Sequence, residues 1–223
     1  MLSVFDIIVR YREALLQGLF VTLQLCAVIW LSGIILGILI GYLGAKFRKS
    51  IGIPSRVISF TLAGIPILVL LFWLYYPGEA LLQLNSISPF YVAAFALSLV
   101  DIFLVADLTR DALVNFPNEY KLAAKVCGIS TKDTFLKIEL PLILRQILPS
   151  LLSIQVNMLQ LTLFASLITV GEIFRVAEQI NAQIYEPVEI YSALAIFFLI
   201  ICLPLNGLAL WLKNKFTRDI SES

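Results

Sequence analysis

One carboxylate lies deep inside an apolar stretch of this 223-residue chain, and it is the strongest candidate for chemistry. Asp101 is the one acid well inside a predicted membrane span. A charged side chain at the centre of such a helix costs about 2.5–3.5 kcal/mol on insertion scales, so Asp101 needs a partner, water or a cation. We expect one of two roles. Asp101 either faces a central cavity and favours a solute with a positive group, or it makes a structural hydrogen bond to a neighbouring helix or a partner subunit.

A second set of polar side chains lies in the apolar stretch 147–171. Gln155 and Thr162 are seven residues apart and share one helical face, whereas Asn157 and Gln160 are three apart and share another. Two polar faces indicate a central helix that contacts both a cavity and its neighbours. Interhelical hydrogen bonding is the alternative explanation.

Composition excludes several other kinds of site. Histidine is absent, which removes the commonest metal ligand and acid–base group. Cys26, Cys127 and Cys202 are far apart and are expected to be inert thiols. The chain also has no GxxxxGK[ST] nucleotide loop. We therefore expect no metal site and no nucleotide bound through such a loop, and a net charge of +1 gives no indication of nucleic-acid binding.

The elements that must position these residues are membrane helices. Hydrophobic residues make up 60% of the chain and charged residues 14%, against about 45–50% and about 25% in a soluble domain. The sequence predicts one all-α integral membrane domain with five transmembrane helices at 19–45, 57–77, 89–108, 147–171 and 190–212. The second span contains Gly64 and Pro66, where a kink is expected. An amphipathic interfacial helix is predicted at the N-terminus, because Val4, Ile7, Tyr11 and Leu15 recur at helical spacing.

The basic residues predict the orientation of these spans. Four follow the first span, six lie in the long loop 109–146 and three lie in the C-terminal tail, so thirteen of the sixteen are on one side. The positive-inside rule places the N-terminus outside and the C-terminus in the cytoplasm. The first span also carries Gly33, Gly37 and Gly41, and this spacing predicts close packing against another helix of this chain or of another subunit.

The loop 109–146 has structural signals of its own. Asn118 is a candidate N-cap for a helix from Glu119 to Cys127. Gly128 lies where a left-handed C-cap is expected. Ser130 and Asp133 predict a second short helix with a capping box, which Pro141 ends or kinks. Two short helices could dock into a groove of a partner or merely connect two spans.

The sequence of this loop, "AAKVCGISTKDTFLKIELP", resembles the EAA loop of the membrane-spanning subunits of bacterial type I ABC importers. The matching positions are Ala123, Ala124, Gly128, Ile138, Leu140 and Pro141. The glutamate of the motif falls on Leu122, and Glu119, one turn earlier, is a candidate substitute. The segments 15–44, 63–76 and 88–113 are similar to the polar amino-acid uptake branch of these permeases.

The resemblance implies a permease subunit in the bacterial inner membrane that translocates a polar amino acid, and the first of the two roles expected for Asp101 would favour a basic one. The chain itself would bind no cofactor and have no enzyme activity, and its coupling loop would dock on an ATPase. The implied partners are two ATP-binding subunits that hold ATP and Mg, a second permease copy of the same or a homologous chain, and an external solute-binding protein. Solute contacts would come from spans two to four, including Gly64 and Pro66. The alternatives are a secondary transporter or channel, which needs coupling-ion chemistry or an inverted repeat, and a membrane assembly protein without transport.

Overall fold

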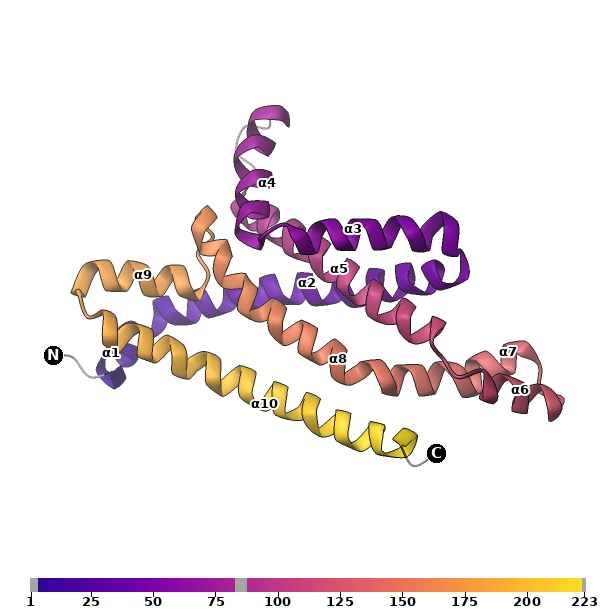
Figure 1. Cartoon of the computed structure of the whole chain (residues 1–223). Helices are drawn as coiled ribbons and strands as arrows, with labels where there is room; N and C mark the ends of the chain where they lie inside the picture. Colours follow the sequence, from indigo (N-terminus) through magenta and orange to yellow (C-terminus); the bar gives the residue numbers. More distant parts are fainter. Residues whose placement is uncertain (1–3, 83–87, 222–223) are drawn as a thin grey trace.

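Four long apolar helices form the body of the molecule. The computed structural model describes the backbone of residues 4–82 and 88–221 and the side chains of residues 4–77 and 88–216. Within these residues, α2 (Arg12–Lys46), α5 (Pro89–Val114), α8 (Leu140–Leu161) and α10 (Pro187–Ser221) run roughly along one axis (Figure 1). A 3-10 turn, η3 (Thr162–Ile168), continues α8. All four helices are long and apolar enough to cross a membrane, and for α8 the crossing includes η3. The predicted all-α membrane fold is confirmed.

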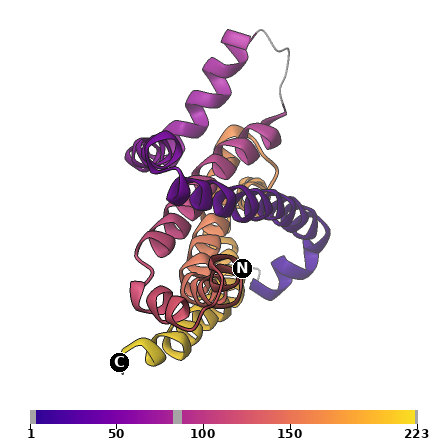
Figure 2. The ribbon, with the colours of Figure 1, turned by 90° about the vertical axis from the view of Figure 1, so that its right-hand side faces the viewer.

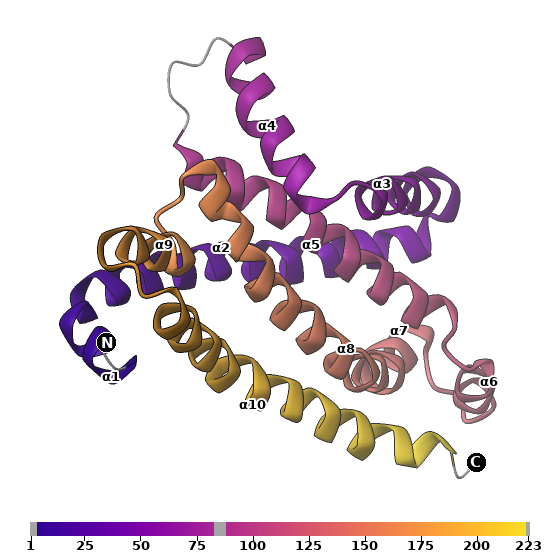
Figure 3. The same cartoon turned by 60° about the vertical axis from the view of Figure 1, so that its left-hand side comes forward.

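The second predicted span is a broken helix. A π-helical turn, η1 (Arg48–Gly52), leads into α3 (Ile53–Gly64), and α4 (Ile67–Leu82) follows after a bend of 97°. Ile65 is extended, with φ −97° and ψ 121°, because the ring of Pro66 disfavours the helical conformation in the residue before it. The sequence predicted a kink within one span, but α4 instead stands away from the bundle (Figures 2 and 3).

One end of the bundle contains the N-terminal helix and a helix that the sequence analysis missed. The predicted amphipathic helix is α1 (Val4–Arg10), and only Tyr11 separates it from Arg12, where α2 begins. Its buried Ile7 packs against α10 and against α9 (Ile173–Ile184). The helix α9 lies where only a loop was expected, although Ile173, Ala177 and Ile180 have the spacing of an amphipathic helix.

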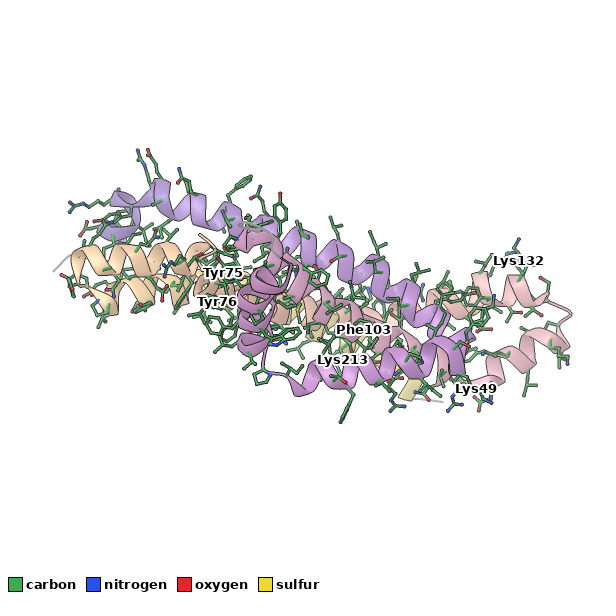
Figure 4. The ribbon with its side chains drawn as sticks, turned by 90° about the horizontal axis from the view of Figure 1, so that it is seen from above. Lys49, Tyr75, Tyr76, Phe103, Lys132 and Lys213 are labelled. Carbon is green, nitrogen blue, oxygen red and sulfur yellow. The ribbon has the colours of Figure 1, made fainter. Side chains whose placement is uncertain are left out.

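The opposite end contains the predicted loop helices and the C-terminus (Figure 1). They are α6 (Asn118–Val126), α7 (Thr131–Thr134) and the π-helical turn η2 (Phe135–Glu139), which leads directly into α8. Lys49 and Lys132, from two of the predicted basic segments, both lie toward this end (Figure 4). Arg218, one of the three basic residues counted in the C-terminal tail, has its side chain outside the described residues.

Two details of this end differ from the predictions. Pro117 is the N-cap of α6, so Asn118 is the first helical residue and makes no side-chain cap. Pro141 does not end the second helix. It lies at the start of α8, directly after the π-helical turn η2, and the helix continues through it. The wider winding of that turn accommodates the proline, which has no N–H to donate.

The glycines of α2 pack against α5 of the same chain. A Cβ atom on Gly33 would lie 1.8 Å from Asp101 Oδ2, and one on Gly37 would lie 2.6 Å from Val105 Cβ. On Gly41 it would lie 2.6 Å from the backbone oxygen of Ala106. The predicted close packing is therefore present, and its partner is within this chain.

Candidate functional site

Asp101 joins three helices in the interior of the bundle. Its side chain is fully buried, and its Oδ1 accepts a hydrogen bond from Gln155 Nε2 of α8 at 3.1 Å. Trp30 of α2 donates to the backbone oxygen of Gln155 at 3.0 Å. Asp101 Oδ2, which faces Gly33, has no hydrogen-bond partner among the described residues. This geometry is that of an interhelical polar contact, the second of the two roles expected for Asp101.

The two polar faces expected on the fourth span have different environments. Gln155 and Thr162 are buried, and the Thr162 hydroxyl donates to the backbone oxygen of Leu159 at 2.7 Å. Asn157 and Gln160 are exposed on the other face. The helix therefore has one polar face toward its neighbours and one that is open, as its spacing predicted.

Asn157 lines a cavity of about 190 Å³ between α3, α4, α5 and α8. Ser59 is the other polar residue of its wall, and Ser59 donates a hydrogen bond to Asp107. Ala63 and Ile65 place the cavity beside the bend that contains Gly64 and Pro66. Phe103 also lines it and lies near the middle of the molecule seen from above (Figure 4). The structure thus brings Asn157, Gly64 and Pro66 together, whereas Asp101 and Gln155 lie in the interior contact.

The turn between α6 and α7 is held by local hydrogen bonds. Gly128 has φ +72°, its N–H donates to the oxygen of Lys125 at 3.1 Å, and the N–H of Ile129 donates to the oxygen of Ala124 at 3.0 Å. This is the two-bond Schellman pattern of a helix end. Ser130 then caps α7 by accepting from the N–H of Asp133 at 3.1 Å. The predicted glycine C-cap is confirmed, and so is Ser130 as the residue that begins the second helix. The second contact of the pair is between side chains, because the Ser130 hydroxyl donates to Asp133 Oδ2 at 2.7 Å.

The coupling residues divide between an inner and an outer surface. Ala124 is buried and lets α6 lie close to the rest of the chain, while Glu119 and Ala123 are exposed. Ile138, Leu140 and Pro141 are half-buried. Lys121 of α6 pairs with Glu139 of η2 at 3.4 Å, which ties the two helical segments together.

An apolar face of α6 has no partner within the described chain. Leu122 is 63% exposed and Val126 is 88% exposed. They are four residues apart and lie on one side of the helix. Leu122, which replaces the glutamate of the motif, therefore extends an exposed apolar surface at the end of the molecule.

Substitution of Gly128 should disturb the turn between α6 and α7 and so weaken the predicted coupling through this helix pair. A Cβ there meets nothing within 4 Å, so the penalty for Gly128→Val is that of the left-handed backbone, about 1–2 kcal/mol. Gly128→Asn should be milder because asparagine tolerates this conformation. We expect lower solute uptake and lower partner ATPase rate in reconstituted vesicles for the valine variant, with most activity kept by the asparagine variant. Unchanged activity in both would contradict a role of this turn in coupling.

Glu172 is a buried residue that the sequence analysis did not select. It lies outside the spanning helices, at the N-cap of α9, and its carboxylate accepts from the N–H groups of Phe174 and Arg175 at 2.9 and 2.7 Å. The N–H of Ile173, at the start of the same helix, donates instead to the hydroxyl oxygen of Thr22 of α2 at 3.1 Å. Burial raises the pKa of Glu172 to about 7, although the two N–H groups act to lower it.

The raised pKa of Glu172 predicts a pH-dependent stability. The folded protein holds this proton more tightly than the unfolded chain, whose glutamate has a pKa of 4.5. The stabilisation is therefore complete below pH 4.5 and is lost as the pH rises through about 7. Thermal unfolding between pH 4 and 8 should show this decline, and Glu172→Gln should flatten it. Glu186→Gln is the matched control, and an equal flattening there would contradict the assignment to Glu172.

No group of three potential metal ligands occurs among residues 4–77 and 88–216. The features that remain are a polar contact inside a helical bundle, a small cavity beside a broken helix, and an exposed helix pair at one end. Together they define a multi-pass α-helical membrane protein whose exposed helix pair lies at one end.

The chain belongs to the family described as binding-protein-dependent transport system inner membrane component, which it matches over residues 33–218. The family resemblance inferred from the loop sequence is confirmed, and the chain is an inner-membrane protein. The octopine transport system permease protein OccM of Rhizobium radiobacter is 30% identical over 199 residues, which cover 84% of this chain and 80% of that protein. The glutamine transport system permease protein GlnP of Escherichia coli strain K12 is 27% identical over 201 residues, covering 90% and 92%.

Solved structures have the same fold. A structure of an amino acid ABC transporter with histidines superposes with a TM-score of 0.82 at 24% identity, covering 93% of this chain and 96% of that one. The methionine ABC transporter MetNI, in an inward-facing conformation, gives a TM-score of 0.71 at 16% identity. The related proteins are named as permeases, in agreement with the prediction that this chain is not itself an enzyme.

Proposed function

We propose that this chain is the permease subunit of an ATP-driven importer and that it moves a polar amino acid across the inner membrane. The observation that carries the proposal is the family match together with relatives named for the transport of octopine, glutamine and arginine. ATP and Mg are bound by two partner ATPase subunits, and an external binding protein delivers the solute. The chain itself supplies the path and the docking element.

The docking element in this proposal is α6 with its exposed Leu122 and Val126. An apolar helix face without a partner is a typical protein-binding surface. The Lys121–Glu139 ion pair and the Ser130 cap connect α6 to the helix that continues into α8. A displacement of α6 by the ATPase would therefore be transmitted along α8 to the cavity at Asn157.

The orientation that we propose has α6 and the C-terminus in the cytoplasm and α1 outside. It is supported by the basic residues, since the segments around Lys49 and Lys132 lie at the same end as α6 (Figure 4). A second permease copy is supported by α4, which stands apart from the bundle (Figure 3) and exposes Val69, Trp73 and Tyr76 by 52–62%. Large apolar surfaces of this kind need lipid or another subunit against them.

The solute path that we propose runs through the cavity beside the Gly64–Pro66 bend. The broken helix makes this side of the bundle adjustable, because only Ile65 and Pro66 join its two halves and Ile65 is extended. Asn157 gives the cavity wall an amide that can donate to and accept from an amino acid. Asp101 and Gln155 hold α5 and α8 in place behind it.

The test of this function is uptake in vesicles that contain the complete transporter with its ATPase and binding protein. Glutamine, arginine and octopine are the first solutes to compare. Asn157→Leu should reduce uptake about tenfold or more, equivalent to ~1.4 kcal/mol, with little effect on stability because the side chain is exposed. Gln24→Leu, an exposed position of α2 outside the cavity, is the control. Equal uptake by the two variants would contradict the path, and no amino-acid uptake by the parent complex would contradict the function.

A further inference from the structure

A second and larger cavity lies far from the proposed solute path. It has a volume of about 280 Å³ and is enclosed by α1, the beginning of α2, α9 and α10. Aliphatic side chains from all four helices and the ring of Phe197 form its walls. This composition excludes a polar solute as its occupant, because nothing on these walls would replace the hydrogen bonds the solute makes in water.

One charged residue lines this cavity. Arg12, at the start of α2, is exposed, and none of the ion pairs among the described residues includes it. Glu13 follows it but does not line the cavity. A guanidinium group with free donors binds a phosphate oxygen pair well. The site thus combines an apolar hollow with an anion-binding group at one position.

The cavity is continuous with the surface that faces the bilayer. Phe5 of α1 is 72% exposed, and Leu16 and Phe20 of α2 are each 61% exposed. Leu16 also lines the cavity. An alkyl chain can therefore enter from the hydrocarbon without crossing a polar surface, while Arg12, at the helix start, lies close to the headgroup level.

We propose that this cavity is a specific binding site for one phospholipid, with an acyl chain between α2, α9 and α10 and the phosphate on Arg12. A volume of about 280 Å³ is too small for a helix of a second copy, whose diameter with side chains is about 10–12 Å. A phospholipid is the membrane component that has both required parts. The site clamps α1 and α9 to the bundle. The orientation proposed above places this phospholipid in the outer leaflet. The binding of a phospholipid in the cavity does not depend on that orientation.

The experiment uses the complete transporter in vesicles of phosphatidylethanolamine and phosphatidylglycerol. The probe is phosphatidylglycerol with a diazirine near the end of one acyl chain, and the matched probe is a diacylglycerol with the same chain and no phosphate. After illumination, mass spectrometry locates the labelled peptides. The phospholipid probe should label the peptides around Leu19 and Phe197 severalfold more strongly than the diacylglycerol probe does.

Substitutions at two positions test the two parts of the site. Arg12→Gln should reduce phospholipid labelling to the diacylglycerol level, whereas Lys49→Gln at the opposite end should not. Ala193, which lines the cavity, tests the hollow: Ala193→Phe should remove the labelling, and Ala193→Leu should reduce it in a protein closer to the original packing.

Equal labelling by both probes would overturn the phosphate assignment. Labelling spread evenly over exposed α10 positions such as Leu199 and Leu203, or cross-links to a neighbouring subunit, would overturn the site. Amino-acid uptake can fail without affecting these readouts, so this inference and the proposed function fail separately.

Discussion

Gly41→Ala is expected to destabilise the isolated chain more than a single added methyl group would suggest. The new Cβ would lie 2.6 Å from the backbone oxygen of Ala106 and 2.7 Å from Thr109 Cβ. A backbone atom of α5 cannot rotate away, so the two helices must separate. Overpacking of this kind costs about 1–3 kcal/mol, and at about 2–4 °C per kcal/mol the unfolding temperature should fall by several degrees.

Gly207→Ala is the matched control for this prediction. Gly207 lies in α10, and an added Cβ there meets nothing within 4 Å. Alanine also has the higher helix propensity, so the unfolding temperature should stay the same or rise slightly. If both variants unfold at the same temperature in detergent, the glycines of α2 are not needed for close packing against α5.

Val126→Glu is expected to uncouple the transporter while leaving the chain folded. Val126 is 88% exposed, so a carboxylate there costs the isolated subunit little. In the complex the same carboxylate would be taken out of water in the apolar contact formed by Val126 and Leu122. A lost hot spot of an interface weakens binding by about 2 kcal/mol or more, which is ~30-fold.

The measurement for this variant is co-purification of the ATPase together with uptake in vesicles. Val188→Glu is the control, because Val188 is 73% exposed on α10 at the opposite end of the bundle. Uptake and ATPase retention should fall for the Val126 variant alone. Normal retention of the ATPase by Val126→Glu would contradict docking through this face.

Local rules explain most of what could be predicted near α6. The left-handed Gly128 and the capping Ser130 depend on a few neighbouring residues, and both occur as expected. Asn118 failed as an N-cap because Pro117 took that position, with the extended backbone that begins the helix. The helix continues through Pro141 because the π-helical turn η2 directly before it accommodates a residue without an N–H.

Features that depend on distant contacts could not be read from the sequence. The glycine spacing of α2 predicted a closely packed neighbour, but only the fold identifies that neighbour as α5. Gly64 and Pro66 predicted a break, but the 97° angle depends on where α4 packs. The periodicity of Ile173, Ala177 and Ile180 was a usable signal for α9, yet it lies between two spans in a stretch expected to be a loop.

The expected solute site was predicted only in part. Helical spacing correctly divided the polar residues of α8 into two faces, because that division depends on the helix geometry alone. Which face meets the cavity depends on the neighbouring helices. The cavity contains Asn157, and Gln155 is held by Asp101 in the interior.

The most direct test of the coupling role uses a cysteine that the chain already has. Cys127 is exposed at the end of α6, beside Val126, while Cys26 and Cys202 are buried. A maleimide that carries a photoreactive benzophenone should therefore react at Cys127 and, in the assembled complex, cross-link to the ATPase on illumination. If the ATPase docks on α6, one product with the combined mass of permease and ATPase should form, and it should be absent in Cys127→Ser. Docking on α6 would be contradicted if no such product forms and if a bulky maleimide reacts with Cys127 equally well with and without the ATPase.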